Sequence, residues 1–399
     1  MRIVVGISVS SGFEGVDAAL LQVNGIGLEL SPRLLASLRV PFPPSLRDWC
    51  TRIRLELSEG ARPASHNERV AIAEVAMQAL RHMLTQASVG VRELFVCGLL
   101  EPAFGSIWLD WSELAARVAE QTGCSVVHSL RSRDRAAGGS GRLLTALADW
   151  LLFRHLPLPR LLLHLGHVTS LLYLPASGGF RQLFGFEVGP GNHWLDSLIY
   201  HGSRGRESCD SGGKRAVQGH HCESLSARWG SHPYLGRRPP KTVPPEAFGR
   251  AFLLSAFATA QSLRLTLSDL LCTATYWIAR CVAEAVSRWL PSDAVTYPLL
   301  VSGGGSRNGF LWQLLNQSFP VGLQRTDVAG IPASARQAAA AAVLACLTCD
   351  GIAGQSPYLT GAQGGRWLGS FCPGDPRHWS RLSAWIAEQT KDLALLRAA

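Results

Sequence analysis

An apolar strand, a short turn containing glycine and a second apolar strand follow one another twice in this chain. The first copy runs through 2–7 and 16–23, with a Ser/Gly turn between them, and the second runs from Arg160 to Leu174 through Gly166. Short apolar runs that are separated by turn residues predict β-hairpins. Recurrence of the same unit indicates two related halves.

The segments between and after these hairpins predict a mixture of helices and strands. A chain of 399 residues that is 47% hydrophobic is expected to form two domains, each with its own core. Apolar spacing predicts, in chain order, a helix over 68–86, a strand over 94–97, a helix over 111–121, an apolar stretch over 143–153, helices over 248–269 and 274–289, and an alanine-rich helix over 333–349. This order predicts an α/β architecture with a cleft between two related domains.

The segment 202–247 differs from its surroundings in composition. It is rich in Gly, Ser, Pro and Arg and has weak periodicity. We expect a long surface excursion or a mobile flap there.

The charge of the chain does not indicate a nucleic-acid partner. The net charge of +9 comes almost wholly from arginine, because lysine occurs only at Lys214, Lys241 and Lys391. The arginines are scattered, with neither a basic run nor interleaved aromatic residues, which argues against a nucleic-acid footprint.

The cysteines and the N-terminus indicate a reducing compartment. The ten cysteines lie mostly in apolar segments, as buried free thiols do. The group Cys209, His220, His221 and Cys222 has no standard zinc spacing, and Cys346 and Cys349 are expected to pack inside a helix. The first apolar run is too short for a secretory signal, and no stretch is long enough to span a bilayer. We therefore predict a cytoplasmic protein with no metal site formed by its own side chains and no membrane partner.

Two glycine clusters are candidate ligand loops. An apolar strand passes through Gly303, Gly304 and Gly305 towards an amphipathic helix that Ser306 or Asn308 can cap. Backbone without Cβ atoms can approach a base or a phosphate, and the free N–H groups of a helix start favour anions. A tight connection between a strand and a helix that binds no ligand would have the same sequence pattern. The second cluster, 184–192, carries a carboxylate at position 187, and two such loops suggest one binding cleft with two walls.

With these clusters the chain resembles the anhydro-N-acetylmuramic acid kinases of the sugar kinase, heat-shock protein and actin superfamily, over nearly its whole length. The resemblance is carried by the segments 6–17, 131–141, 185–192 with Asp196, 301–308, and 326–330, and by smaller echoes at 239–241 and 359–362. It implies two ribonuclease-H-like domains with a central cleft, as in actin-like ATPases. The first would span 1–158, to which the C-terminal segment 372–399 can be added, and the second would span 159–371.

The resemblance also implies a reaction and its participants. Such enzymes use ATP and Mg²⁺ to hydrolyse the 1,6-anhydro bridge of the sugar and to phosphorylate the freed O6, in recycling of cell-wall peptidoglycan. A carboxylate accepts the proton of the attacking water, and its place in the motif is taken by Glu187. The family is usually dimeric, which implies a homodimer. The alternative is a catalytically weakened relative that senses a nucleotide or a sugar, or a kinase for a related sugar.

The residues that the resemblance places in the site fall into two further groups. The cofactor group is Ser10, Ser11, Gly12, Glu14, Gly15, Asp17, Gly166, Gly303, Gly304, Gly305 and Asn308. The substrate group is Arg131, Asp134, Gly189, Gly191 and Asn192. Alternatives stay open at several of them: Asp17 either assists Mg²⁺ indirectly or ends a turn, and Arg131, Arg133 and Asp134 either orient substrate or form a structural ion-pair cluster.

The chain departs from the family pattern near the expected cleft. Glu187 stands where the family has Asp, and Gln337 stands where it has Glu. The first phosphate loop, 9–17, is altered at five positions, and one glycine of the second loop is replaced by His167. A His-Gly-Gln-Thr segment of the family appears as 97–100, Cys-Gly-Leu-Leu, which removes polar groups.

Overall fold

The structure is a computed structural model that describes residues 1–10, 12–55, 64–103, 110–155, 157–176, 179–291 and 298–398, with side chains up to residue 391. It divides into two compact units. Unit 1 comprises Met1–Ile53, Gly60–Arg154 and Ala329–Ala399, and unit 2 comprises Arg54–Glu59 and His155–Val328.

Unit 1 is built on a six-stranded sheet in the order β11-β5-β4-β1-β2-β3. Its strands are β1 (Arg2–Val9), β2 (Gly15–Asn24), β3 (Ser31–Pro41), β4 (Leu94–Leu100), β5 (Val126–His128) and β11 (Ser370–Cys372). The strands β1, β2 and β3 pair antiparallel, whereas β4 pairs parallel with both β1 and β5. The predicted N-terminal hairpin is therefore confirmed, with β3 as a further strand that the sequence reading did not predict.

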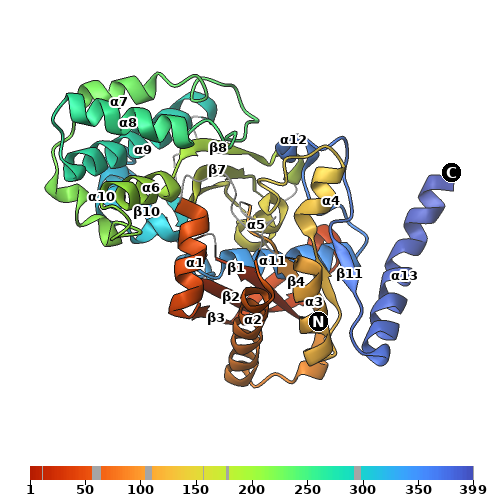
Figure 1. Cartoon of the computed structure of the whole chain (residues 1–399). Helices are drawn as coiled ribbons and strands as arrows, with labels where there is room; N and C mark the ends of the chain where they lie inside the picture. Colours follow the sequence, from red (N-terminus) through yellow and green to blue (C-terminus); the bar gives the residue numbers. More distant parts are fainter. Residues whose placement is uncertain are drawn as a thin grey trace. The chain divides into compact units, whose positions relative to one another are not determined.

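The helices of unit 1 are α1 (Pro44–Leu55), α2 (His66–Ala87), α3 (Trp111–Thr122), α4 (Leu130–Ala136), α5 (Ala146–Phe153), α11 (Arg336–Cys349), α12 (Pro357–Thr360) and α13 (Pro376–Ala398). Helices α2 and α11 pack on this sheet, α2 against β2 and β3 and α11 against β1, β2 and β4, and Figure 1 shows them with the other helices of unit 1. A Cβ atom on Gly6 of β1 would lie 1.8 Å from the carbonyl oxygen of Ala338, and one on Gly98 of β4 would lie 2.2 Å from that of Ala341. The alanine-rich α11 thus packs against the sheet at a distance that only glycine in the strands permits.

This packing places the C-terminal part of the chain in unit 1. The stretch 329–371 belongs to unit 1, whereas the sequence reading assigned it to the second domain. The reason is that α11 is buried along its whole length against β1 and β4, so it contributes to the core of the N-terminal sheet.

Unit 2 repeats the arrangement of unit 1. Its sheet has the order β10-β9-β6-β7-β8, formed by β6 (Arg160–Leu165), β7 (Val168–Leu174), β8 (Phe184–Pro190), β9 (Leu299–Ser302) and β10 (Leu323–Arg325). The strands β6, β7 and β8 are antiparallel, and β9 is parallel to β6 and β10. Numbered in order of appearance, the first five strands of unit 1 and the five strands of unit 2 are both arranged 3-2-1-4-5 with the same directions, and β11 extends the sheet of unit 1 beside β5. This shared order confirms the predicted duplication and the ribonuclease-H-like domains.

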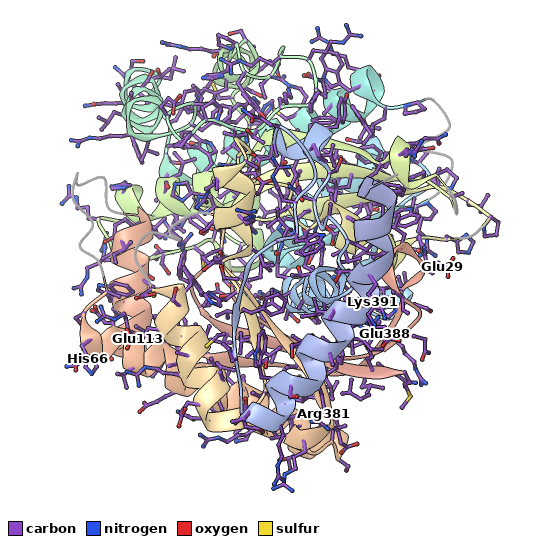
Figure 2. All side chains as sticks on the ribbon, turned by 90° about the vertical axis from the view of Figure 1, so that its right-hand side faces the viewer. Glu29, His66, Glu113, Arg381, Glu388 and Lys391 are labelled. Carbon is purple, nitrogen blue, oxygen red and sulfur yellow. The ribbon has the colours of Figure 1, made fainter. Side chains whose placement is uncertain are left out.

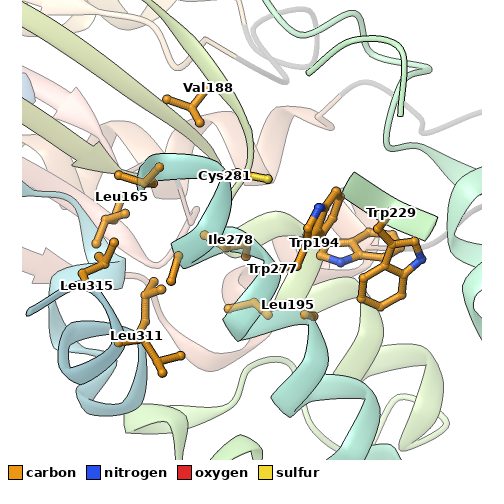
Figure 3. Close-up of a cluster of buried hydrophobic side chains, with 14 of the residues drawn as sticks. Leu165, Val188, Trp194, Leu195, Trp229, Trp277, Ile278, Cys281, Leu311 and Leu315 are labelled. Carbon is orange, nitrogen blue, oxygen red and sulfur yellow. The ribbon is translucent and has the colours of Figure 1, made fainter. Parts of the chain in front are cut away.

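A tryptophan-rich core fills unit 2. Its helices are α6 (Asn192–Gly202), α7 (Glu223–Gly230), α8 (Arg250–Ser262), α9 (Leu267–Trp289) and α10 (Gly309–Ser318). Trp194 of α6, Trp229 of α7 and Trp277 of α9 are all buried and contact one another (Figure 3), with ring centroids of Trp229 and Trp277 5.3 Å apart. Trp194 meets the other two rings edge-on, and aromatic contacts of this kind stabilise beyond the area that they bury.

Two expectations about unit 2 were wrong. The segment 202–247 is not a surface excursion, because it contains α7 and buries Leu225, Trp229, Tyr234 and Val243 in the core. The helix expected over 248–269 ends at Ser262, and α9 begins at Leu267, because the hydroxyl of Thr266 caps it in a reciprocal pair with Asp269.

The helix α13 runs along the surface of unit 1 (Figure 2). Arg381, Glu388 and Lys391 lie on it and are exposed. In the part of the chain that the structure describes, no helix combines the length and the apolar character needed to cross a bilayer.

Candidate functional site

Three loops of unit 2 meet at the ends of its strands. The turn after β6 contains Gly166, whose carbonyl oxygen accepts a hydrogen bond of 2.8 Å from the backbone N–H of Asn192. The side-chain amide of Asn192 donates to the carbonyl oxygen of Leu165 at 3.1 Å. A Cβ atom on Gly191 would lie 2.5 Å from the Gly166 oxygen, and one on Gly305 would lie 2.8 Å from Oδ1 of Asn192. The structure therefore brings together the predicted residues of two glycine clusters and of the β6–β7 turn.

The three consecutive glycines have different roles. Gly303, with φ of 89°, and Gly305 are close to the β6–β7 turn, since a Cβ atom on either would lie within 2.7 Å of an atom of Leu165. Their lack of a side chain serves packing between loops. Gly304 is exposed, and the nearest atom to a Cβ there would be Nδ2 of Asn192 at 3.4 Å, an ordinary contact. Of the three, Gly304 is the one whose backbone a ligand can approach.

The helix after the glycines is capped as expected. Oδ1 of Asn308 accepts a hydrogen bond of 3.0 Å from the backbone N–H of Leu311, which fixes the start of α10. Asn308 is therefore engaged as a cap. Behind the loop, Nδ1 of His164 lies 3.0 Å from the hydroxyl of Ser302 and its ring approaches Gly303. Sequence reasoning did not assign His164 a role, and its position inside the altered second loop was the available signal.

Glu187 is a buried carboxylate on β8. It is 5% exposed, and its Oε2 accepts a hydrogen bond of 2.7 Å from the backbone N–H of Val243. Its own N–H donates to the carbonyl oxygen of Lys241 at 3.0 Å, and its carbonyl oxygen accepts from the hydroxyl of Tyr234 at 2.6 Å. The segment that contains Tyr234 and Lys241 thus fixes Glu187 along one edge of β8. Sequence reasoning missed this support, for which the Pro-Pro-Lys echo at 239–241 was the only signal.

The other predicted residues of this strand end lie close in sequence to Glu187. Gly189 sits next to the side chain of Leu235, since a Cβ atom there would lie 3.1 Å from it. Gly191 and Asn192 then lead from β8 into α6 and contact the β6–β7 turn. The base candidate and the glycine loops are therefore parts of one connected structure within unit 2.

The corresponding turn of unit 1 is closed by Ser10. The Ser10 hydroxyl accepts hydrogen bonds from the backbone N–H groups of Glu14 at 2.9 Å and of Gly15 at 3.2 Å. Gly15 lies against β3, where a Cβ atom would be 2.3 Å from the carbonyl oxygen of Val40, while a Cβ atom on Gly12 would lie 3.4 Å from the side chain of Glu14. The prediction for Ser11 falls outside the described residues.

Asp17 forms a two-contact ion pair. Its carboxylate accepts hydrogen bonds from Nε of Arg39 at 2.6 Å and from Nη2 at 2.8 Å, across neighbouring strands. The pKa of Arg39 is raised, chiefly by this hydrogen bond. The side chain of Glu14 is exposed, and its Oε2 lies 3.6 Å from Nη1 of Arg39. Asp17 therefore lies within β2 and does not end a turn, and both of its oxygens bind arginine.

Arg131 and Asp134 hold a loop. Nε of Arg131 donates to the carbonyl oxygen of Glu101 at 2.7 Å, and its Nη1 donates to that of Gly141. Oδ2 of Asp134 accepts from the N–H of Gly141 at 2.8 Å. Burial lowers the pKa of Arg131 to about 10 and raises that of Glu101. These contacts favour a structural role, and substrate contact by either residue stays a prediction.

Comparison with protein families gives one match over nearly the whole chain. The sequence profile described as anhydro-N-acetylmuramic acid kinase matches residues 2–374. Two curated relatives carry the same name. The protein from Cyanothece sp. is 30% identical, with 90% of this chain and 96% of the relative covered. The protein from Streptomyces coelicolor is 32% identical, with 93% of this chain and 94% of the relative covered.

Solved structures show a more distant likeness. Component A of (R)-2-hydroxyglutaryl-CoA dehydratase from Acidaminococcus fermentans is 11% identical, with a TM-score of 0.43 and coverage of 86% of this chain and 97% of that chain. The assignment of fold given above rests on the strand order of the two sheets.

Proposed function

Because this chain belongs to the anhydro-N-acetylmuramic acid kinase family, we propose that Glu187 is its general base and that the glycine loops of unit 2 hold its nucleotide. The enzyme is an ATP-dependent sugar kinase, a phosphotransferase with an alcohol group as acceptor. Its relatives are named as kinases of anhydro-N-acetylmuramic acid. The proposed substrate is therefore 1,6-anhydro-N-acetylmuramic acid, and the proposed product is N-acetylmuramic acid 6-phosphate.

The position of Glu187 carries the proposal for the base. The carboxylate is buried and anchored through one oxygen, so its orientation is fixed before substrate arrives. As base it accepts a proton from the water whose oxygen attacks the anomeric carbon. The bond between that carbon and O6 breaks, and O6 becomes the nucleophile for the γ-phosphorus of ATP, from which ADP leaves.

The exposure of Gly304 supports the assignment of the nucleotide to these loops. Gly304 is exposed and its missing side chain leaves room for a ligand, whereas its neighbours are fixed by contacts with Leu165 and Asn192. A preorganised loop of backbone N–H groups suits phosphate and the ribose-bearing part of a nucleotide. Ser10, Glu14 and Gly15 of unit 1 remain candidates for contacts with the phosphates.

Mg²⁺ is proposed to enter with ATP, where it neutralises charge on the phosphates. Asp17 does not fit as a direct ligand, because Arg39 occupies both of its oxygens. We propose that Asp17 positions Arg39 beside the first turn. Homodimer formation and a cytoplasmic location stay predictions.

An isotope experiment tests the reaction. The purified chain is incubated with Mg-ATP and 1,6-anhydro-N-acetylmuramic acid in ¹⁸O water, and the products are measured by mass spectrometry. The expected product carries one ¹⁸O on the anomeric carbon and an unlabelled phosphate ester at O6. Binding of ATP without any product would contradict catalysis and favour the sensing alternative.

A further inference from the structure

We propose that a cavity beside Lys241 in unit 2 is a binding site for a small oxyanion, a phosphate or a carboxylate, separate from the glycine loops. The cavity has a volume of about 230 Å³, which is ample for a small anion with bound water. The lining residues that matter for its chemistry are Val188, His232, Lys241, Cys281, Glu284 and Arg288.

Lys241 is a buried cation without an opposite charge. It is 9% exposed, and its Nζ donates to the carbonyl oxygens of Leu235 at 3.0 Å and Tyr234 at 3.3 Å. The ammonium also lies 4.7 Å from the centre of the Tyr234 ring. Among the described residues no carboxylate lies within 4.0 Å of it. A buried charge that is solvated only by neutral groups is costly, so an anion in the adjacent cavity would stabilise it.

The remaining charges around the cavity give it a positive excess. Arg288 lines the cavity and lies over the ring of Trp289, 4.7 Å from its centre, with no carboxylate partner in the described part of the chain. The carboxylate of Glu284 lies 3.5 Å from Arg280, so its charge is matched outside the cavity. An oxyanion in the cavity would therefore lie near two cations, Lys241 and Arg288. The one acidic residue of the lining, Glu284, is already paired with Arg280.

The titratable groups around the cavity agree with this balance. Burial, together with the charges of Arg288 and Arg237, lowers the pKa of Lys241 to about 8. Burial also lowers the pKa of His232 and raises that of Cys281 to about 12, so both are neutral at pH 7. A bound anion would raise the pKa of Lys241, because it favours the charged form.

The cavity is distinct from the proposed catalytic position. Val188, which lines the cavity, is packed in the hydrophobic core of unit 2, whereas the carboxylate of Glu187 accepts a hydrogen bond from the backbone N–H of Val243. Val188 and Cys281 lie on the core side of β8 (Figure 3). The residues that line the cavity do not include Glu187, so the proposed oxyanion site is separate from the proposed base.

Chemical labelling tests the site without any activity assay. The chain has three lysines, and Lys214 and Lys391 are exposed, so they are internal controls. The protein is treated with acetic anhydride at pH 8, in sodium chloride or in phosphate or acetate at equal ionic strength, and acetylation is mapped by mass spectrometry. At an anion concentration ten times the dissociation constant, labelling of Lys241 relative to Lys214 should fall about tenfold.

Protection by either anion supports the site, and protection by phosphate alone assigns it to phosphates. Equal labelling of Lys241 in all three salts would overturn the proposal.

A thermal-unfolding series provides the second measurement, using wild type, Lys241→Met, Arg288→Gln and the control Lys214→Met. The anion should raise the melting temperature of wild type and of the control and fail to do so in the first two variants. An equal rise in all four proteins would place the anion elsewhere, and no rise in wild type would also overturn the proposal.

Discussion

The backbone N–H of Val243 donates a hydrogen bond of 2.7 Å to Oε2 of Glu187. The bond joins β8 to a segment that lies more than fifty residues further along the chain. Val243 in this segment is part of the core, which the sequence did not predict. It fixes the carboxylate that we propose as base, and it requires a side chain of this length.

Glu187→Gln should abolish sugar phosphorylation and leave ATP binding intact, because the amide oxygen still accepts from Val243 but cannot take a proton from water. Glu187→Asp should lose the Val243 bond and turn over about a hundredfold more slowly, since its carboxylate is retracted by one methylene. Turnover is measured as phosphorylated sugar, and ATP binding as a shift in melting temperature. Phosphorylation by Glu187→Gln at the wild-type rate would exclude Glu187 as the base.

Gly304 and Gly305 form a matched pair for testing the nucleotide loop. Gly304→Val should preserve the fold but remove stabilisation by ATP, because Gly304 is exposed and its side-chain direction is open. Gly305→Ala should lower the melting temperature without any ligand, because its Cβ would lie 2.7 Å from the Cβ of Leu165. ATP stabilisation of Gly304→Val equal to that of wild type would contradict the assignment.

Asp17→Asn and Arg39→Met should each reduce the free energy of unfolding by roughly 3 kcal/mol, because each leaves one partner of a largely buried ion pair. The double variant should lose less free energy of unfolding than the sum of the two single losses, since both substitutions remove the same ion pair. Denaturant titrations give these values. Kinase assays over a range of Mg²⁺ concentrations give the control: a raised Mg²⁺ requirement in Asp17→Asn alone would show that Asp17 serves the metal.

Thr266→Ala should reduce the free energy of unfolding by about 1 kcal/mol, because it removes the cap of α9. The hydroxyl of Thr266 also helps to lower the pKa of Asp269 to about 2, from an ordinary value near 3.8. A lowered folded-state pKa stabilises the fold above pH 4, and this contribution is lost as the pH falls from 4 to 2. The difference between wild type and variant, followed by denaturation, should therefore shrink over that range. Ser262→Ala, which removes a hydroxyl at the end of α8, should show no such pH dependence.

The sequence by itself determined the two hairpins, the duplication and the family. These follow from local patterns: apolar alternation around Gly166 and the glycines at 303–305 specify strands and turns before any tertiary contact forms. The cap at Asn308 was equally readable, because it depends on residues within one helical turn.

Only the tertiary structure decided which glycine is open to a ligand, which unit α11 joins and what holds Glu187. Gly303, Gly304 and Gly305 are the same residue type, and contact with Leu165 separates Gly303 and Gly305 from the exposed Gly304. Asp17 meets Arg39, and Glu187 meets Val243, through pairings between segments that are distant in sequence. Contacts of this kind arise when sheets and helices pack, so no local periodicity records them.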